Sequence, residues 1–387
     1  MIAPSLAKLS FGYPANLRSR PSSGRSREEG PDIAFRPREH LAYLDGLRGV
    51  AILAVLAVHA SQLVASLSQP VRDLAFYGVR GVQLFFIVSG FTLVFAHAGR
   101  PLDPFSFAAR RFFRIAPMFY AGMVLYLVLS RVTTMPLSTR DATGLDIAAT
   151  LLFVHGWMPS AINTVVPGGW SIAAEAMFYL VFPAILALVP RPRILIAAVF
   201  LSYVVAGLTN IALRKLLGGA AGEALAFPFW LVQLPAFIGG CWLATLPHPV
   251  PLARRIAPWS FGLAALGMLV DSQLRESSNL LVAVALLTVF AWSASVVRPR
   301  WLQARPLVFL GRISFSFYIV HFAVLGCIRP LVPAMEAAVG GDLAMLTVAS
   351  LTLAIASCIA AGTFRWIELP IIAATRRVGQ RGVPAGA

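Results

Sequence analysis

The chain has 387 residues, of which 58% are hydrophobic and only 12% are charged, whereas a typical soluble domain has about 25% charged residues. With a mean hydropathy of +0.77, this composition excludes a soluble globular protein and predicts an all-α protein that crosses the lipid bilayer many times. The net charge of +16 does not indicate nucleic-acid binding, because the basic residues gather on alternate short segments and on the tails, as membrane topology requires.

The first 40 residues are rich in Arg, Ser, Pro and Gly and contain no apolar stretch of the kind found in a secretory signal peptide. A transit peptide is an alternative interpretation of this composition. The acidic pair Glu28-Glu29 and the prolines favour a solvated cytoplasmic tail instead. We therefore expect residues 1–40 to be disordered.

Apolar stretches long enough to cross a hydrocarbon core of about 30 Å follow this tail. We expect ten membrane-spanning helices around a polar tunnel, near residues 50–68, 80–98, 116–131, 171–189, 194–212, 228–246, 258–272, 279–297, 309–329 and 343–364. This count places only eight of the 32 basic residues on one side of the membrane. Because basic loops favour the cytoplasm, we expect both termini there, with the protein in the inner (plasma) membrane of a bacterium and residues 371–387 as a cytoplasmic tail.

One apolar segment, residues 147–158, is too short to cross the bilayer. We interpret it as a re-entrant or interfacial segment on the outer side. The three cysteines all lie in apolar stretches, without the spacing of a disulfide framework or a zinc site. We therefore predict no bound metal.

Three polar side chains stand in the first expected span. Arg48 and His59 are eleven residues apart, which places them within about 20° of each other and roughly 16 Å apart along a helix, with Asp45 on nearly the same stripe. An ionisable group near the bilayer midplane is costly and usually faces a wet cavity, so His59 is a candidate functional residue. The alternatives are a buried helix contact for His59, and for Arg48 an interfacial anchor or a partner of Asp45.

This stretch resembles the start of the membrane acyltransferase 3 family, in which an Arg and a His are separated by ten residues in a Leu-Asp-Gly-Leu-Arg-Gly context. The resemblance covers about residues 41–370. Gln83 stands where the family usually has an acidic residue, and Ala176-Met177 where it commonly has Glu-Gln. Further blocks follow in the family's order, at residues 81–91, 111–117, 170–179, 313–321 and 368–370.

The resemblance implies a membrane acyltransferase domain at residues 41–370. Its reaction would move an acyl group, often acetyl, from cytoplasmic acyl-CoA to a hydroxyl of a sugar, a cell-envelope or lipid-linked glycan, or a small molecule. Acyl-CoA would be a co-substrate, and no permanently bound cofactor is expected. An imidazole with an ordinary pKa of about 6.5 is partly unprotonated at neutral pH, so His59 could act as general base toward the acceptor hydroxyl.

The other candidate residues have both functional and structural interpretations. Arg110, Arg111 and Arg114 form a cluster suited to a polyanionic nucleotide, although positive-inside topology also produces such clusters; the resemblance ties Arg111 and Arg114 to the acyl donor. Glu175 needs a polar partner or must protonate. We assign Glu175, Arg48 and Asp45 to the catalytic site together with His59. The carboxylate of Glu175 would orient His59 or stabilise its positive charge.

Aromatic and histidine side chains supply candidates for the acceptor. We assign Trp170, Tyr179 and His321 to acceptor binding, although Trp170 and Tyr179 could also be interfacial aromatics. Glu368 is expected to pair with a basic residue such as Arg365. The rival function is a proton-coupled transporter or flippase of an anionic or glycan substrate, in which buried His, Arg and Glu carry protons or guide an anion; a catalytically silent assembly partner is a third possibility.

Overall fold

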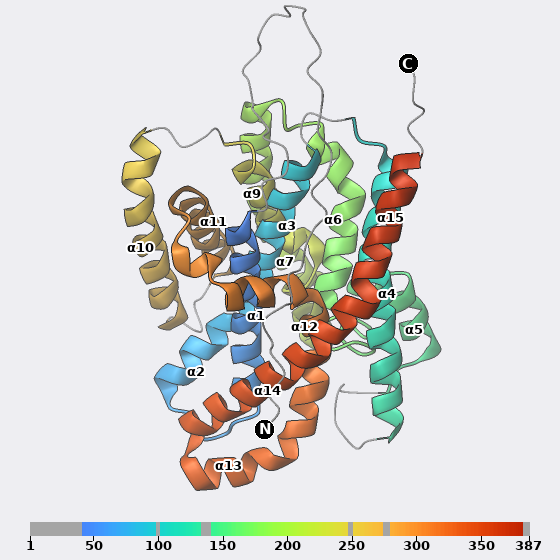
Figure 1. Ribbon diagram of the computed structural model, residues 1–387, viewed down its shortest axis with the longest axis vertical. Helices are drawn as coiled ribbons and strands as arrows, with labels where there is room; N and C mark the ends of the chain where they lie inside the picture. The colour runs from blue at the N-terminus through green and yellow to red at the C-terminus, as the bar shows by residue number, and fades with distance from the viewer. Residues whose placement is uncertain (1–40, 98–100, 133–140, 247–250, 274–278, 382–387) are drawn as a thin grey trace, which may run out of the picture. The chain divides into compact units, whose positions relative to one another are not determined.

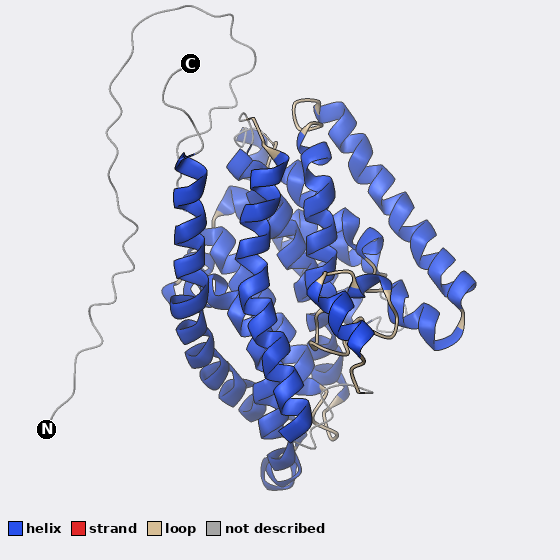
Figure 2. Ribbon diagram, turned by 90° about the vertical axis from the view of Figure 1, so that its right-hand side faces the viewer, coloured by secondary structure: helices blue, strands red, loops and turns tan. Residues whose placement is uncertain are grey.

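The computed structural model describes residues 41–97, 101–132, 141–246, 251–273 and 279–381. Every regular element in these ranges is helical, as Figure 2 shows. The predicted disorder of residues 1–40 lies outside the described residues. The all-α architecture follows from the apolar composition, because a helix satisfies all of its backbone hydrogen bonds within one segment and can therefore cross lipid.

Each of the ten expected spans corresponds to a helix. These helices are α1 (Ala42–Ser61), α3 (Gly81–His97), α4 (Pro104–Val132), α6 (Trp170–Leu186), α7 (Pro192–Leu217), α9 (Trp230–Leu243), α10 (Pro251–Gln273), α11 (Leu280–Val297), α12 (Arg305–Ile328) and α14 (Gly341–Thr363). By length and composition, eight helical stretches among the described residues could cross a membrane. Two of the ten helices are not among these eight stretches. They are α6, which has only 17 residues, and α10, which carries Arg254, Arg255 and Asp271. The chain is a multi-pass membrane protein.

Shorter elements connect or extend the long helices. They are α2 (Gln69–Phe76), η1 (Tyr77–Arg80), α5 (Gly144–Leu151), η2 (His155–Trp157), α8 (Gly219–Ala226), η3 (Arg300–Gln303), η4 (Arg329–Leu331), α13 (Val332–Val339), the π-helical turn η5 (Phe364–Glu368) and α15 (Leu369–Arg381). In Figure 1, α2 and α13 lie at the lower end of the bundle, and the C-terminal end of α15 lies at the upper end. The segment expected as a C-terminal tail is thus helical as far as Arg381.

The segment at residues 147–158 forms the end of α5, a turn and η2. Thr143 and Asp146 cap α5 reciprocally, since each side chain accepts a hydrogen bond from the backbone N–H of the other residue. A helix of eight residues is about 12 Å long, so α5 cannot cross a hydrocarbon core of about 30 Å. The segment is therefore too short to span the membrane, as predicted, and its location on the outer side stays a prediction.

Glycines bring the central helices into backbone contact. A Cβ added to Gly46 of α1 would lie 1.8 Å from the backbone oxygen of Leu302, and a Cβ added to Gly311 of α12 would lie 1.8 Å from the backbone oxygen of Asp45. Such close approach between helices in a membrane requires small residues at the contact. The contact between α1 and α12 places two of the helices that line the candidate site.

Candidate active site

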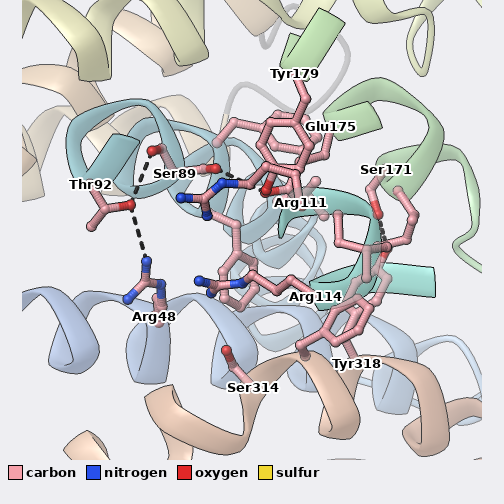
Figure 3. A pocket seen from close by; sticks show the side chains of 16 residues that line it. Arg48, Ser89, Thr92, Arg111, Arg114, Ser171, Glu175, Tyr179, Ser314 and Tyr318 are labelled. Atoms are coloured by element: carbon pink, nitrogen blue, oxygen red, sulfur yellow. Dashed lines mark hydrogen bonds between the residues drawn. The ribbon is translucent and has the colours of Figure 1, made fainter. Parts of the chain in front are cut away.

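A polar pocket opens between α1, α3, α4, α6 and α12 (Figure 3). The volume of the pocket, including the part that is open to solvent, is about 760 Å³. Three arginines line it, together with one carboxylate, several hydroxyl groups and the rings of Phe85 and Phe86. A cavity with convergent charged groups and apolar walls is the normal form of a small-molecule site.

Arg48 enters the pocket from the first half of α1. Its Nη1 donates to Asp45 Oδ1 at 3.2 Å. Its Nη2 donates to Thr92 Oγ1 of α3 at 3.3 Å (Figure 3). The carboxylate of Asp45 is shared with Arg312 of α12, at 3.4 Å. Asp45 therefore orients Arg48, as the spacing of three residues on one helix predicts, and it links α1 to α12 by charge.

Arg111 and Arg114 both reach the pocket from the N-terminal half of α4. The guanidinium carbon of Arg111 lies 5.5 Å from the ring centre of Phe107 and 5.7 Å from that of Tyr179, so it makes cation–π contacts with two neighbouring rings. Its Nε is buried without a hydrogen-bond partner among the described residues. Arg114 is exposed at the pocket, and Arg110 does not belong to its lining.

Glu175 supplies the carboxylate of the pocket from α6. Its Oε1 accepts hydrogen bonds from Ser89 Oγ of α3 at 2.8 Å and from the hydroxyl of Tyr179 at 2.6 Å (Figure 3). These partners replace the expected pairing with His59, which is absent from the described contacts of Glu175. The reason is tertiary: this face of α6 turns toward α3 and α4.

His59 lies on the last turn of α1 and does not line the pocket. Its Nδ1 is 3.1 Å from Gln62 Oε1, and its ring centre is 4.4 Å from that of Phe322 and 5.5 Å from that of His321. The ring of His321 is in turn 5.7 Å from Tyr318, which does line the pocket. The pocket therefore does not reach His59, because these aromatic rings stand between the arginines and the His59 imidazole; a polar tunnel through the whole bundle stays a prediction.

A hydrogen-bond network fixes this partition. The hydroxyl of Tyr318 donates to the backbone oxygen of Gly168 at 2.9 Å and accepts a hydrogen bond from Ser171 Oγ at 2.9 Å. Gly168 has a φ of +73°, and a Cβ there would lie 2.8 Å from the Tyr318 hydroxyl oxygen. Only glycine accommodates both that backbone conformation and that contact.

Most of the chain matches one family of known proteins. The model of the acyltransferase domain family (Acyl_transf_3) matches residues 41–363. The chain belongs to this family. The resemblance found in the sequence is therefore confirmed, and the protein is a membrane acyltransferase.

Curated relatives have matching names. Acyltransferase MdmB of Streptomyces mycarofaciens is 29% identical over 328 residues, which are 74% of this chain and 79% of that protein. The O-acetyltransferase OatA of Staphylococcus aureus is 22% identical over 328 residues, 75% of this chain and 51% of that protein. Peptidoglycan O-acetyltransferase OatA of Listeria monocytogenes is 28% identical over 185 residues, 42% of this chain and 27% of that protein. The matches thus span about half of one OatA protein and about a quarter of the other. No solved structure matches the chain significantly.

The three predicted acceptor-binding residues of this acyltransferase occupy different environments in the structure. Tyr179 lines the pocket, beside Arg111. Trp170 is 9% exposed and packs edge-on against Phe86 at 6.2 Å, so it is a core residue behind the pocket wall. His321 is fully buried in α12, and its Nδ1–H donates to the backbone oxygen of Tyr318 at 2.7 Å.

The sequence did not mark several hydroxyl groups of the pocket as site residues. Ser89 and Thr92 of α3 and Ser314 of α12 all line it. For Ser89 and Thr92 the available signal was two small polar residues three apart within an apolar span, which share one helix face. Among the described residues, no three His, Cys, Asp or Glu side chains gather as metal ligands would.

Proposed function

We propose that this acyltransferase moves an acyl group from acyl-CoA to the hydroxyl oxygen of a sugar, a cell-envelope glycan or a small-molecule acceptor. Acetyl is the acyl group that we propose. The observation that carries the proposal is the convergence of Arg48, Arg111 and Arg114 on one pocket. Guanidinium groups bind phosphates through charge-assisted and bidentate hydrogen bonds. Coenzyme A offers several phosphates to such groups, and the O-acetyltransferase name of OatA supports acetyl as the acyl group.

His59 is the general base in this proposal. With its Nδ1–H donating to Gln62 Oε1, its Nε2 keeps a lone pair that can accept a proton. The acceptor oxygen attacks the thioester carbonyl carbon as His59 takes its proton, and collapse of the tetrahedral intermediate expels the CoA thiolate, with no covalent enzyme intermediate. Because Tyr318, His321 and Phe322 stand between the pocket and His59, the proposal includes displacement of these rings when substrates bind.

The remaining site residues support the donor. Asp45 orients Arg48, and Glu175 lies near enough to Arg48 and Arg111 to offset part of their charge. The asymmetry of basic residues supports entry of acyl-CoA from the cytoplasm, with both termini on that side of a bacterial inner membrane. The acceptor would approach from the outer side or as a lipid-linked glycan.

Membrane vesicles from cells that express the full chain provide the first test, because they contain both the enzyme and the native acceptors. Release of the CoA thiol from acetyl-CoA and incorporation of acetyl into glycan are measured together. Replacing His59→Ala should lower the rate by about 10²–10⁴-fold, the usual contribution of a general base. Replacing His97→Ala, a histidine of α3 outside the pocket lining, is the matched control and should leave the rate unchanged.

The donor part of the proposal has a separate readout. Replacing Arg111→Ala should raise the KM for acetyl-CoA about tenfold or more, because a phosphate loses a charged partner. Full activity of the His59→Ala protein would remove the general-base mechanism. Transport of a glycan or anion without thioester consumption would instead favour the transporter alternative.

The acceptor can be identified by comparing cells with and without the gene. Mass spectrometry of envelope glycans and small metabolites should show one acyl group that is present only when the gene is intact. Identical acylation in both strains would exclude the acceptors so surveyed.

A further inference from the structure

The arginines of the pocket are matched by acidic side chains from different helices. Asp45 forms an ion pair with Arg48, and Glu175 interacts electrostatically with Arg111. Arg114 also has an acidic neighbour, but this one does not line the pocket. It is Glu368, whose carboxylate lies near enough to the Arg114 guanidinium to attract it through space, although the two described side chains form no ion pair.

Glu368 reaches this position through an irregular turn. It is the last residue of the π-helical turn η5, which joins α14 to α15 and packs against α4, the helix that carries Arg114. Figure 1 shows the chain changing direction between α14 and α15. π-helical turns inside α-helices often occur at functional sites. Glu368 belongs to the block at residues 368–370 that resembles the family, just beyond the region that the family model matches, residues 41–363.

The carboxylate of Glu368 is buried and held from α12. Glu368 is 7% exposed, and its Oε1 accepts a hydrogen bond from the hydroxyl of Ser316, which is fully buried. Ser316 stands between Phe315 and Tyr318, which both line the pocket. Arg365, the expected partner of Glu368, forms no ion pair with it, although both residues are described, so the structure corrects that pairing: the hydrogen-bond partner of the carboxylate is Ser316.

Arg114 needs such a partner. It is exposed, and no hydrogen bond or ion pair with another described residue fixes its long side chain. Its guanidinium also feels repulsion from Arg48 and Arg111. Without an opposing charge, like charges in one pocket move apart, because their repulsion is strong where water is partly excluded.

We propose that Glu368 is a positioning residue that holds Arg114 over the donor pocket and thereby connects the C-terminal turn to acyl-CoA binding. This inference rests on the proposed function, since it takes acyl-CoA as the ligand of Arg114. Glu368 touches no substrate in this scheme. Its effect therefore passes through Arg114 and appears in donor binding rather than in the chemical step.

A double-mutant cycle tests the inference in membranes containing the full chain, with acetyl-CoA as the varied substrate. Replacing Glu368→Gln keeps the shape of the side chain and removes its charge. It should raise the KM about fivefold and leave kcat within about twofold, whereas Arg114→Ala should raise the KM about tenfold. In the double variant, Glu368→Gln should add nothing to the effect of Arg114→Ala.

Glu336→Gln is the matched control, because Glu336 is a carboxylate of α13 that accepts hydrogen bonds from the backbone N–H and the hydroxyl of Ser66 and is outside the pocket lining. Its KM should equal that of the parent. If Glu368→Gln does not fold, as judged by size-exclusion chromatography, Ser316→Ala replaces it in the cycle and should raise the KM about twofold, only when Arg114 is present.

Two results would overturn the inference. One is an unchanged KM in the Glu368→Gln protein while Arg114→Ala raises it, and the other is an equal rise from Glu368→Gln in both backgrounds, which would indicate a purely structural role. An unchanged KM in the Arg114→Ala protein would instead contradict the donor site of the proposed function, so the two failures are distinguishable.

Discussion

Two acidic side chains inside this bundle, Asp45 and Glu175, form contacts that join different helices. Asp45 binds Arg48 on its own helix and Arg312 on α12. Glu175 accepts hydrogen bonds from its own helix and from α3. Because an isolated buried charge is expensive in a low-dielectric interior, each of these contacts both lowers that cost and fixes the position of a pocket residue.

His155 is a buried residue outside the membrane-spanning helices with a testable pH effect. It is 1% exposed, its Nε2–H donates to the backbone oxygen of Gly169 at 3.0 Å, and its ring stacks on Phe119. Burial lowers its pKa below the ordinary value. The unfolded chain therefore binds a proton at this site more readily than the folded protein does. The stability contributed by the neutral imidazole is present above about pH 6.5 and is lost as the pH falls below it.

We expect the Tm of the purified protein to fall between about pH 7.5 and pH 5.5, and to fall less in a His155→Gln variant, by about 2–4 °C. Thermal unfolding in detergent at several pH values measures this difference. Parallel pH profiles for the two proteins would contradict the role of His155. Since Gly169 precedes α6, which carries Glu175 and Tyr179, this histidine also secures the start of a pocket helix.

At the scale of elements, the central helix pairs depend on glycine. Gly311 of α12 touches the backbone of Asp45, and Gly240 of α9 touches the backbone of Ile87 in α3. These contacts bring α12 close to α1, and α9 close to α3. Since α1, α3 and α12 all line the pocket, the spacing of these helices sets the distances between the pocket side chains.

Replacing Gly311→Ala should destabilise the protein by about 1–3 kcal/mol, because its Cβ would overlap the Asp45 carbonyl oxygen and force α1 and α12 apart. It should also raise the KM for acetyl-CoA, since Arg48 is held by Asp45. Gly262→Ala in α10 is the control: no atom lies within 4 Å of its added Cβ. There the free energy of unfolding should stay equal or rise by up to about 1 kcal/mol. Equal stability of the two variants would contradict close packing at Gly311.

For the whole molecule, the order of apolar and basic segments predicts which ends of the helices face the cytoplasm. The segment before α12 carries Arg298 and Arg300, and Arg305 is the first residue of α12, whereas α5 carries no basic residue. Basic segments resist translocation across the membrane. We therefore expect η3 on the cytoplasmic side and α5 on the opposite side.

Single cysteines test this orientation in a background without the three native ones. Leu145→Cys in α5 and Trp301→Cys in η3 are suitable, because these side chains are 66% and 49% exposed. A membrane-impermeant thiol reagent applied to intact spheroplasts should label the variant at position 145. It should label the variant at position 301 only after permeabilisation. The reverse pattern would invert the proposed topology.

The sequence by itself determined the class of the protein, its helices and several pocket residues. Apolar length is a local property, so the ten expected spans all correspond to helices. Helical spacing also predicted the contact between Asp45 and Arg48. Arg111, Arg114 and Glu175 stood out as charges in or beside apolar segments, and all three line the pocket.

Only the tertiary structure decided which helix faces meet. The spacing of residues along a helix determines which face of the helix a side chain occupies. It does not determine which other helix packs against that face. The partners of Glu175 and Glu368 therefore came from α3 and α12, and not from His59 and Arg365. For the same reason the sequence did not reveal that rings from α12 separate His59 from the arginines: that separation depends on packing between segments about 260 residues apart, which no local pattern records.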